Sequence, residues 1–179
     1  MKNIQYYFFG YSPTRYQISL TFASAILCVL VLIFSNADKN FHWLTWLILV
    51  ELSMDIGGGA ISNLFESTKR FYQTDNIRGK IHKWLRNPLI FASLHIHLII
   101  IHALIDPGKL DGAFYITGMI ILAVVLASSI RHKNSLFFAG AMSLTIFLVS
   151  WFLPIIISLY WLYGVFIFKL VVAYSTRIQ

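Results

Sequence analysis

Charged residues are scarce in this chain of 179 residues, because Asp, Glu, Lys and Arg together make up only 12% of it. Soluble domains carry about 25%. Hydrophobic residues make up 58%, and the mean hydropathy is +0.73. A water-soluble core of this size cannot enclose so much apolar surface, so most of the chain must have lipid as its solvent. The composition therefore excludes an ordinary soluble domain.

Cysteine is almost absent, since Cys28 is the single cysteine in the sequence. One cysteine forms no internal disulfide and offers no zinc or redox motif, so we interpret Cys28 as a small packing residue. The sequence also has no Walker loop, dinucleotide glycine pattern, nucleophile elbow or zinc-protease helix. The longest polar connection, 66–87, is too short for a separate catalytic domain. Any activity must therefore lie among the apolar segments or at their inner rim.

Long apolar runs are what the sequence does contain. They predict six transmembrane helices, over residues 16–34, 41–65, 88–105, 113–130, 135–152 and 155–174. The last two come from one apolar block about twice as long as a single crossing needs, so we expect a tight turn at Pro154, with one kinked helix as the alternative. The predicted fold is an all-α, polytopic integral membrane helix bundle, with residues 1–179 forming one transmembrane domain.

Positive charge is distributed unevenly between the predicted loops. With six spans and a cytoplasmic N-terminus, only Lys39 and Lys109 fall on the outer side. The other basic residues fall on the inner side: Lys2, Arg15, Lys69, Arg70, Arg78, Lys80, Lys83, Arg86, Arg131, Lys133, Lys169 and Arg177. This is the positive-inside pattern, so we predict that the N- and C-termini are both cytoplasmic. We interpret the net charge of +7 as a topology signal and expect no nucleic-acid binding.

The inner connection 66–87 has a basic amphipathic pattern. Apolar residues recur at helical spacing and basic residues take much of the remaining surface: Ile77, Ile81, Trp84 and Leu85, with Arg78, Lys80, Lys83 and Arg86. This pattern predicts a helix on the inner leaflet, with a solvated basic loop as the alternative. The expected partners are the lipid bilayer and anionic inner-leaflet lipids, and an oligomer or a membrane partner stays open. The frequent Ile, Lys and Asn are typical of a low-GC bacterium, so we expect a multi-pass protein of the plasma (cytoplasmic) membrane.

Two carboxylates interrupt the second span. By helical rise, Glu51 lies about 15 Å below the outer boundary and Asp55 about 6 Å deeper. A carboxylate at that depth costs about 3 kcal/mol, so it rarely faces lipid. Ser62 and Glu66 share this helical face, and Asn63 lies nearby. We therefore predict a polar stripe that faces the bundle interior, with one acid protonated or a cation between the two acids.

Three consecutive glycines, Gly57, Gly58 and Gly59, follow these acids. Glycine weakens a helix. In lipid, glycines either let a neighbouring helix approach closely or let the helix unwind and turn carbonyl groups toward a ligand. We expect close packing and keep the local break as the alternative.

The third span carries three histidines, His95, His97 and His102. Because this span runs in the opposite direction, His95 and His97 reach roughly the depth of Glu51. In an intact helix His95 and His102 share one face, whereas His97 points about 200° away from His95. The three imidazoles therefore cannot bind one metal ion from an intact helix.

The acids and histidines together allow two kinds of chemistry. Glu51, Asp55 and His95 are candidate ligands for a divalent metal. Alternatively, a chain of proton-exchanging groups runs from Asp106 through His102 and His95 to the carboxylates. Hydrogen bonds that only hold two spans together are the structural interpretation.

The inner end of the second span forms another polar cluster, with Ser62, Asn63, Glu66, Lys69, Arg70 and Tyr72. Adjacent Lys69 and Arg70 at a membrane boundary predict binding of a lipid head group or another anion. Ordinary interfacial anchoring is the alternative.

These observations favour a small membrane protein for proton- or cation-coupled transport or permeation, with Glu51, Asp55 and His95 at its protonatable site. A membrane-embedded, metal-dependent enzyme acting on a lipid or lipophilic substrate is the second hypothesis. The third is an accessory protein whose polar residues are structural. The sequence specifies no substrate.

Overall fold

The computed structural model describes residues 9–10, 12–73, 84–130 and 134–176. Over these residues the chain is helical and forms no strand. The elements in chain order are α2 (Arg15–Ser35), α3 (Trp43–Ser62), α4 (Glu66–Gln73), α6 (Pro88–Leu94), α7 (His97–Ile105), η1 (Pro107–Lys109), α8 (Leu110–Ser129), α9 (Ser135–Ser150), η3 (Ile157–Leu159), α10 (Tyr160–Ile167) and η4 (Phe168–Tyr174).

Five helical segments of the described chain are long and apolar enough to cross a membrane: Arg15–Ser35, Trp43–Ser62, Pro88–Ile105, Pro107–Ser129 and Ile157–Tyr174. They match five of the six predicted spans. The remaining span, expected at 135–152, corresponds to α9, which has only 16 residues. An α-helix of that length is about 24 Å long, which is shorter than the hydrocarbon core of about 30 Å.

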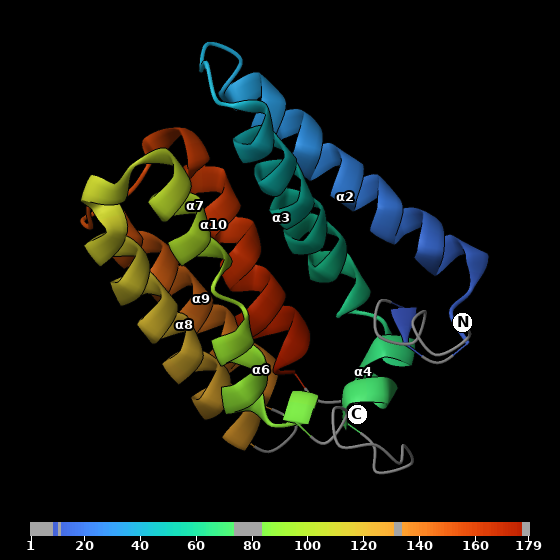
Figure 1. Ribbon diagram of the computed structural model, residues 1–179. Helices are drawn as coiled ribbons and strands as arrows, with labels where there is room; N and C mark the ends of the chain where they lie inside the picture. The colour runs from blue at the N-terminus through green and yellow to red at the C-terminus, as the bar shows by residue number, and fades with distance from the viewer. Residues whose placement is uncertain (1–8, 11, 74–83, 131–133, 177–179) are drawn as a thin grey trace.

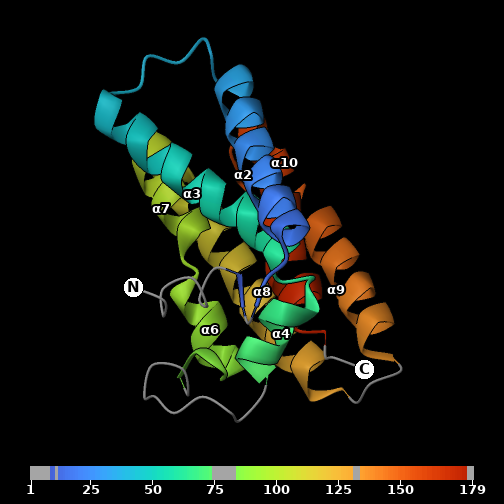
Figure 2. The same ribbon diagram turned by 90° about the vertical axis from the view of Figure 1, so that its right-hand side faces the viewer.

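The helices run alternately up and down (Figure 1). α2 and α3 form an antiparallel pair, and the chain then rises through α6 and α7, descends in α8, rises in α9 and descends through α10 and η4 (Figure 2). As a result, α2 begins and η4 ends at the end of the bundle that holds α4. We call this end the α4 end.

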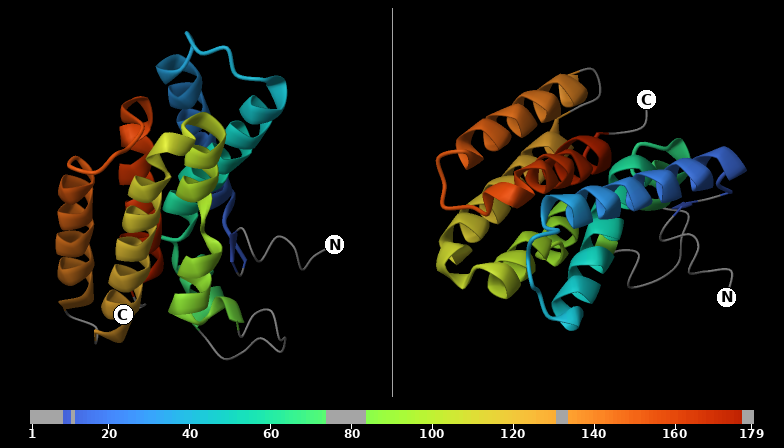
Figure 3. Two further views of the ribbon diagram at one scale, coloured as in Figure 1. Left: turned by 60° about the vertical axis from the view of Figure 1, so that its left-hand side comes forward. Right: turned by 90° about the horizontal axis from the view of Figure 1, so that it is seen from above.

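The last helix lies at the centre of the bundle. Seen from above, α10 runs between the α8–α9 pair and the α2–α3 pair (Figure 3). Phe166, Leu170 and Val171 are fully buried there. α10 and η4 contact α3, α8 and α9, so this segment joins the two helix pairs.

A turn separates α9 from α10, as the sequence predicted, so the alternative of one kinked helix is wrong. α9 ends at Ser150 and η3 begins at Ile157, with Pro154 between them. The turn rests on α8 at Gly112, where an added Cβ would lie 2.1 Å from the carbonyl oxygen of Pro154. Glycine is needed at this position because the backbone of the turn occupies the space of a side chain.

The consecutive glycines pack α3 against α2, and α3 stays helical through them. A Cβ on Gly57 would lie 2.5 Å from Sγ of Cys28, and the Ser24 hydroxyl donates to the Gly57 carbonyl at 2.8 Å. The close-packing prediction is therefore confirmed, and the predicted alternative of a break at the glycines is wrong. Cys28 is buried in this contact.

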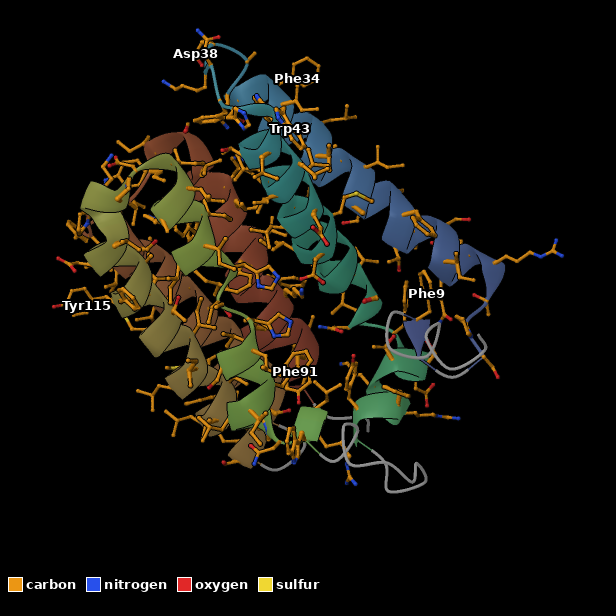
Figure 4. All side chains as sticks on the ribbon, in the orientation of Figure 1. Phe9, Phe34, Asp38, Trp43, Phe91 and Tyr115 are labelled. Carbon is orange, nitrogen blue, oxygen red and sulfur yellow. The ribbon has the colours of Figure 1, made fainter. Side chains whose placement is uncertain are left out.

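Large apolar side chains cover much of the outer surface. Phe34, Phe137 and Phe152 are 78%, 81% and 86% exposed. Figure 4 shows Phe34 at the far end of α2 and Tyr115 pointing away from α8. Such a surface is stable in lipid and not in water, so the chain has the character of a membrane-embedded protein. Residues 74–83, which carry most of the predicted basic amphipathic segment, lie outside the described residues.

Candidate functional site

Asp55 lies at the centre of a polar cluster on the cavity wall, and its side chain is 43% exposed. Its Oδ2 accepts a hydrogen bond from Nζ of Lys169 at 2.5 Å and lies 2.8 Å from Nε2 of His97. The same lysine also donates to the backbone carbonyl of Asp55 at 3.1 Å. One carboxylate oxygen thus joins three elements that are distant in sequence, namely α3, α7 and η4. We call Asp55, His97 and Lys169 the central triad.

Lys169 is 2% exposed and is the second residue of the π-helical segment η4. The prediction that this lysine is one of the cytoplasmic topology charges is wrong, because its side chain is buried against α3. Lys169 lies five residues before the end of η4 and extends toward α3, where it occupies the space beside Gly59. A buried ammonium group needs a carboxylate partner, and Asp55 provides it.

The third span is broken at His95 and Ile96. α6 ends at Leu94, and His95 has φ −91° and ψ 63°, outside the helical region. The His95 imidazole donates from Nδ1 to the Phe91 carbonyl at 2.7 Å, while the His95 backbone N–H bonds to Ala92. The ring thus replaces the backbone donor that an intact helix would direct at Phe91.

This break brings two imidazoles together that an intact helix would separate. The rings of His95 and His97 stack with centroids 5.3 Å apart and planes inclined by 24°. His97 then begins α7 and reaches Asp55. The prediction that His97 points about 200° away from His95 is wrong because it assumed a continuous helix.

A partly open cavity of about 840 Å³ adjoins the central triad. One wall is the polar stripe of α3, with Glu51, Asp55, Gly58, Gly59, Ser62 and Asn63. The facing wall holds the imidazoles and the lysine: His95, His97 and Lys169. Apolar and aromatic groups complete it: Phe9, Phe22, Leu52, Met54, Tyr72, Leu85 and Phe91, with Thr21 and Ala25. Glu51, Asp55, Ser62 and Asn63 of the polar stripe therefore line this cavity.

The α4 end of the cavity is bounded by aromatic rings. Phe91 stacks on Tyr174 with centroids 3.8 Å apart and planes inclined by 4°. Tyr72 contacts both rings edge to face, and the Tyr174 hydroxyl donates to the Leu85 carbonyl at 2.9 Å. Figure 4 shows Phe91 between α6 and α4, and Phe9 on the opposite side of α4 beside the start of α2.

Glu51 and Asn63 line the cavity without a partner in the described part of the chain. Glu51 is exposed, and it forms no hydrogen bond or ion pair with another described residue. Asn63 is only 6% exposed, and its Nδ2 is buried with no acceptor among the described residues. Glu51 therefore presents a carboxylate to this space, and Asn63 places an unpaired amide group in its wall.

His102 and Asp106 lie apart from the central triad. His102 is fully buried, donates from Nδ1 to the Leu98 carbonyl at 2.8 Å and accepts at Nε2 from the Tyr163 hydroxyl at 2.8 Å. Asp106 pairs with Lys109 at 3.1 Å. Both His102 nitrogens are thus satisfied within the core, and the chain of proton-exchanging groups considered from the sequence is not assembled through it.

Lys69 and Arg70 each have a partner within the chain. α3 ends at Ser62, so Glu66 does not continue the polar stripe and instead pairs with Arg70 at 2.5 Å. Lys69 donates from Nζ to the Thr176 hydroxyl at 2.7 Å, and burial lowers the pKa of its ammonium group. The two residues predicted as an anion-binding pair therefore have separate protein partners.

The structure does not assemble the candidate metal ligands Glu51, Asp55 and His95 into one site. No group of three His, Cys, Asp or Glu side chains suited to a metal ion occurs among the residues described. The cation beside Asp55 is the ammonium group of Lys169, which forms no ion pair with Glu51, so it is not the predicted cation between the two acids.

Lys169 is the residue that sequence reasoning missed. Its signal was available, because it is the single charged residue between Lys133 and Arg177 and lies within an apolar run. A lysine so placed requires either the interface or a buried acid, and Asp55 was the acid at comparable depth.

No protein family, curated protein or solved structure matches this chain.

Proposed function

We propose that this chain is a small multi-pass transport or permeation protein whose central triad couples the movement of a proton or cation to a change in helix packing. The observation that carries this proposal is the Asp55 carboxylate, which Lys169 and His97 share on the wall of an internal cavity. Ionisable groups inside a membrane bundle are costly, and they typically mark ion pathways and proton relays.

Proton exchange follows from the hydrogen bonds of His97. With Asp55 ionised, the His97 Nε2–H donates to the carboxylate, while Nδ1 is buried without a donor from the described residues. Nδ1 is therefore the position that takes up a proton. A protonated His97 competes with Lys169 for the same oxygen of Asp55, and this competition weakens the contact that joins α3 to η4.

The helix break supplies the movable element. Transport sites are often built from discontinuous helices, whose ends move relative to each other without unfolding. Here α6 and α7 meet at His95 and Ile96, beside the triad and the cavity. In the proposed cycle, protonation of His97 strengthens the Asp55–His97 contact and draws α7 toward α3, while the Asp55–Lys169 contact that joins α3 to η4 loosens.

The membrane placement forms part of the same proposal. We place six crossings in the bilayer, counting α9 as a short one, with both termini in the cytoplasm of a bacterial plasma membrane. The excess of basic residues at the α4 end supports this orientation and contact with anionic inner-leaflet lipids. The beginning of α2 and the end of η4 at one end of the bundle agree with an even number of crossings.

Proton flux in liposomes tests this function. Purified protein is reconstituted with a trapped pH-sensitive dye, and a potassium gradient with valinomycin drives proton entry. We expect flux above that of empty liposomes. His97→Gln keeps a donor for Asp55 but does not titrate, so it should lower flux about tenfold or more, as loss of a charge-assisted interaction of about 1.5–3 kcal/mol implies.

The matched control is His42→Asn, at the exposed N-cap of α3. Asn is a good N-cap residue, so this variant should retain flux. Flux no greater than that of empty liposomes, or equal flux in wild type and His97→Gln, would reject the proposed function in favour of the structural interpretation.

A further inference from the structure

We propose that the cavity binds a lipophilic organic cation, such as an amine or quaternary ammonium compound with an apolar body, and that Glu51 is the carboxylate that binds it. This inference names the substrate class of the proposed transport site. It therefore extends the proposed function, and the experiment below separates the two.

The charges on the cavity wall indicate the sign of the ligand's charge. Asp55 and Lys169 neutralise each other at 2.5 Å, and both are held in the central triad. Glu51 lines the same cavity and has no cationic partner among the described residues. A carboxylate in an apolar helix long enough to cross a membrane is costly without a cation, so a positively charged ligand would complete the site.

The size of the cavity and its apolar walls indicate that the ligand has an apolar body. A cavity of about 840 Å³ lies within the range of about 300–1,000 Å³ that is typical of small-molecule sites. Aromatic rings and flexible apolar side chains surround the acid: Phe9, Phe22, Met54, Tyr72 and Phe91. Aromatic faces attract organic cations, and they also remove the apolar part of the ligand from water.

Asn63 is a second unpaired polar group in the wall of the cavity. A buried amide donor without an acceptor costs about 1–3 kcal/mol, so such groups are rarely left unpaired. Asn63 lines the cavity twelve residues after Glu51, about 18 Å away along α3. An elongated cation bound at Glu51 would reach Asn63 with a hydrogen-bond acceptor such as an ether or carbonyl oxygen.

Two ions of similar shape and opposite charge test directly whether the cavity prefers a cation. Binding of tetraphenylphosphonium and of tetraphenylborate is measured to the wild-type protein in lipid nanodiscs, with empty nanodiscs subtracted. We expect saturable binding of the cation and none of the anion. Equal binding of both ions, or no saturable binding of the cation, overturns the inference without any variant.

Glu51→Gln should weaken binding of the cation about 10- to 100-fold, while Glu51→Asp should retain most of it. The matched control is Glu66→Gln, because Glu66 is an exposed carboxylate paired with Arg70 and does not line the cavity. If Glu51→Gln and Glu66→Gln bind the cation equally well, Glu51 is not its ligand.

The Asn63 contact is tested with dodecyltrimethylammonium and its ω-methoxy derivative. Asn63→Leu should weaken binding of the methoxy compound about 2- to 10-fold, the effect of one neutral hydrogen bond, and leave binding of the plain compound unchanged. An equal effect on both compounds contradicts a specific contact with Asn63.

The two proposals fail separately. Cation binding without proton flux retains the binding site and rejects coupled transport. Proton flux without cation binding retains the proposed function and rejects the organic cation as its substrate.

Discussion

A Cβ atom on Gly59 would lie 2.4 Å from Cε of Lys169 and 2.9 Å from its Nζ. Glycine at this position therefore leaves the space through which the lysine reaches Asp55. The last of the three consecutive glycines thus accommodates a side chain of η4, whereas Gly57 and Gly58 face α2. The glycine run in this way serves helix packing and the central triad together.

Gly59→Ala is expected to destabilise the protein by about 2–4 kcal/mol. The methyl group would meet Cε and Nζ of Lys169, so the buried ammonium group must shift relative to Asp55; complete loss of such a pair costs about 3–5 kcal/mol, and the better helix propensity of alanine offsets part of the effect. Gly58→Ala is the control, since its Cβ would meet Ala25 and Thr21 at an ordinary 3.5 Å. Thermal unfolding in detergent compares the two variants, and equal melting temperatures would contradict the assignment.

Asp55 and Lys169 should be energetically coupled. Asp55→Asn leaves the deeply buried ammonium group without its carboxylate, so we expect a loss of about 2–4 kcal/mol. Lys169→Met should cost less, because the Asp55 carboxyl retains His97 and faces the cavity. The double variant should be more stable than the sum of the single changes predicts, by about 1–3 kcal/mol. Strict additivity in unfolding measurements would show that the pair is not coupled.

Tyr163→Phe should affect stability and leave transport intact. The change removes the hydroxyl that donates to Nε2 of His102, and an unpaired buried acceptor costs about 1–3 kcal/mol. Because this pair lies apart from the central triad, proton flux per correctly folded protein should match wild type. A selective loss of flux at unchanged stability would instead connect His102 to the pathway.

Gly112→Ala should disturb the turn between α9 and α10. Its Cβ would meet the Pro154 carbonyl oxygen at 2.1 Å, and backbone atoms cannot move away cheaply. Overpacking of this kind costs about 1–3 kcal/mol or more. Gly118→Ala on the same helix is the control, because nothing lies within 4 Å of its Cβ. Comparable unfolding of the two variants would indicate that the turn does not rest on α8.

Much of the helical architecture followed from hydropathy alone. The apolar runs predicted the positions of five long helices and the turn at Pro154, because lipid requires continuous helices whose backbone groups are paired. The length of α9 was harder to predict, since the end of an apolar run does not specify where its backbone leaves the helix.

The acids were the easiest part of the site to identify. A carboxylate in an apolar run stands out in any sequence, and helical spacing related Glu51 to Asp55. The partners of these acids were harder to identify, because a contact depends on the depth and the rotation of two helices that are far apart in the sequence. For this reason Lys169 was predicted to lie on the inner side of the membrane. His97 was predicted to point away from His95 because the third span was assumed to be one unbroken helix.

The sequence by itself determined that this is a membrane-embedded helical protein with acids that need an internal environment, because transfer free energies depend on residue type and run length. Only the tertiary structure decided which cation neutralises Asp55, which imidazole contacts it and which acid has no partner among the described residues. Those outcomes depend on a helix break at His95 and on the packing of η4 against Gly59, and both result from contacts between segments that no local pattern encodes.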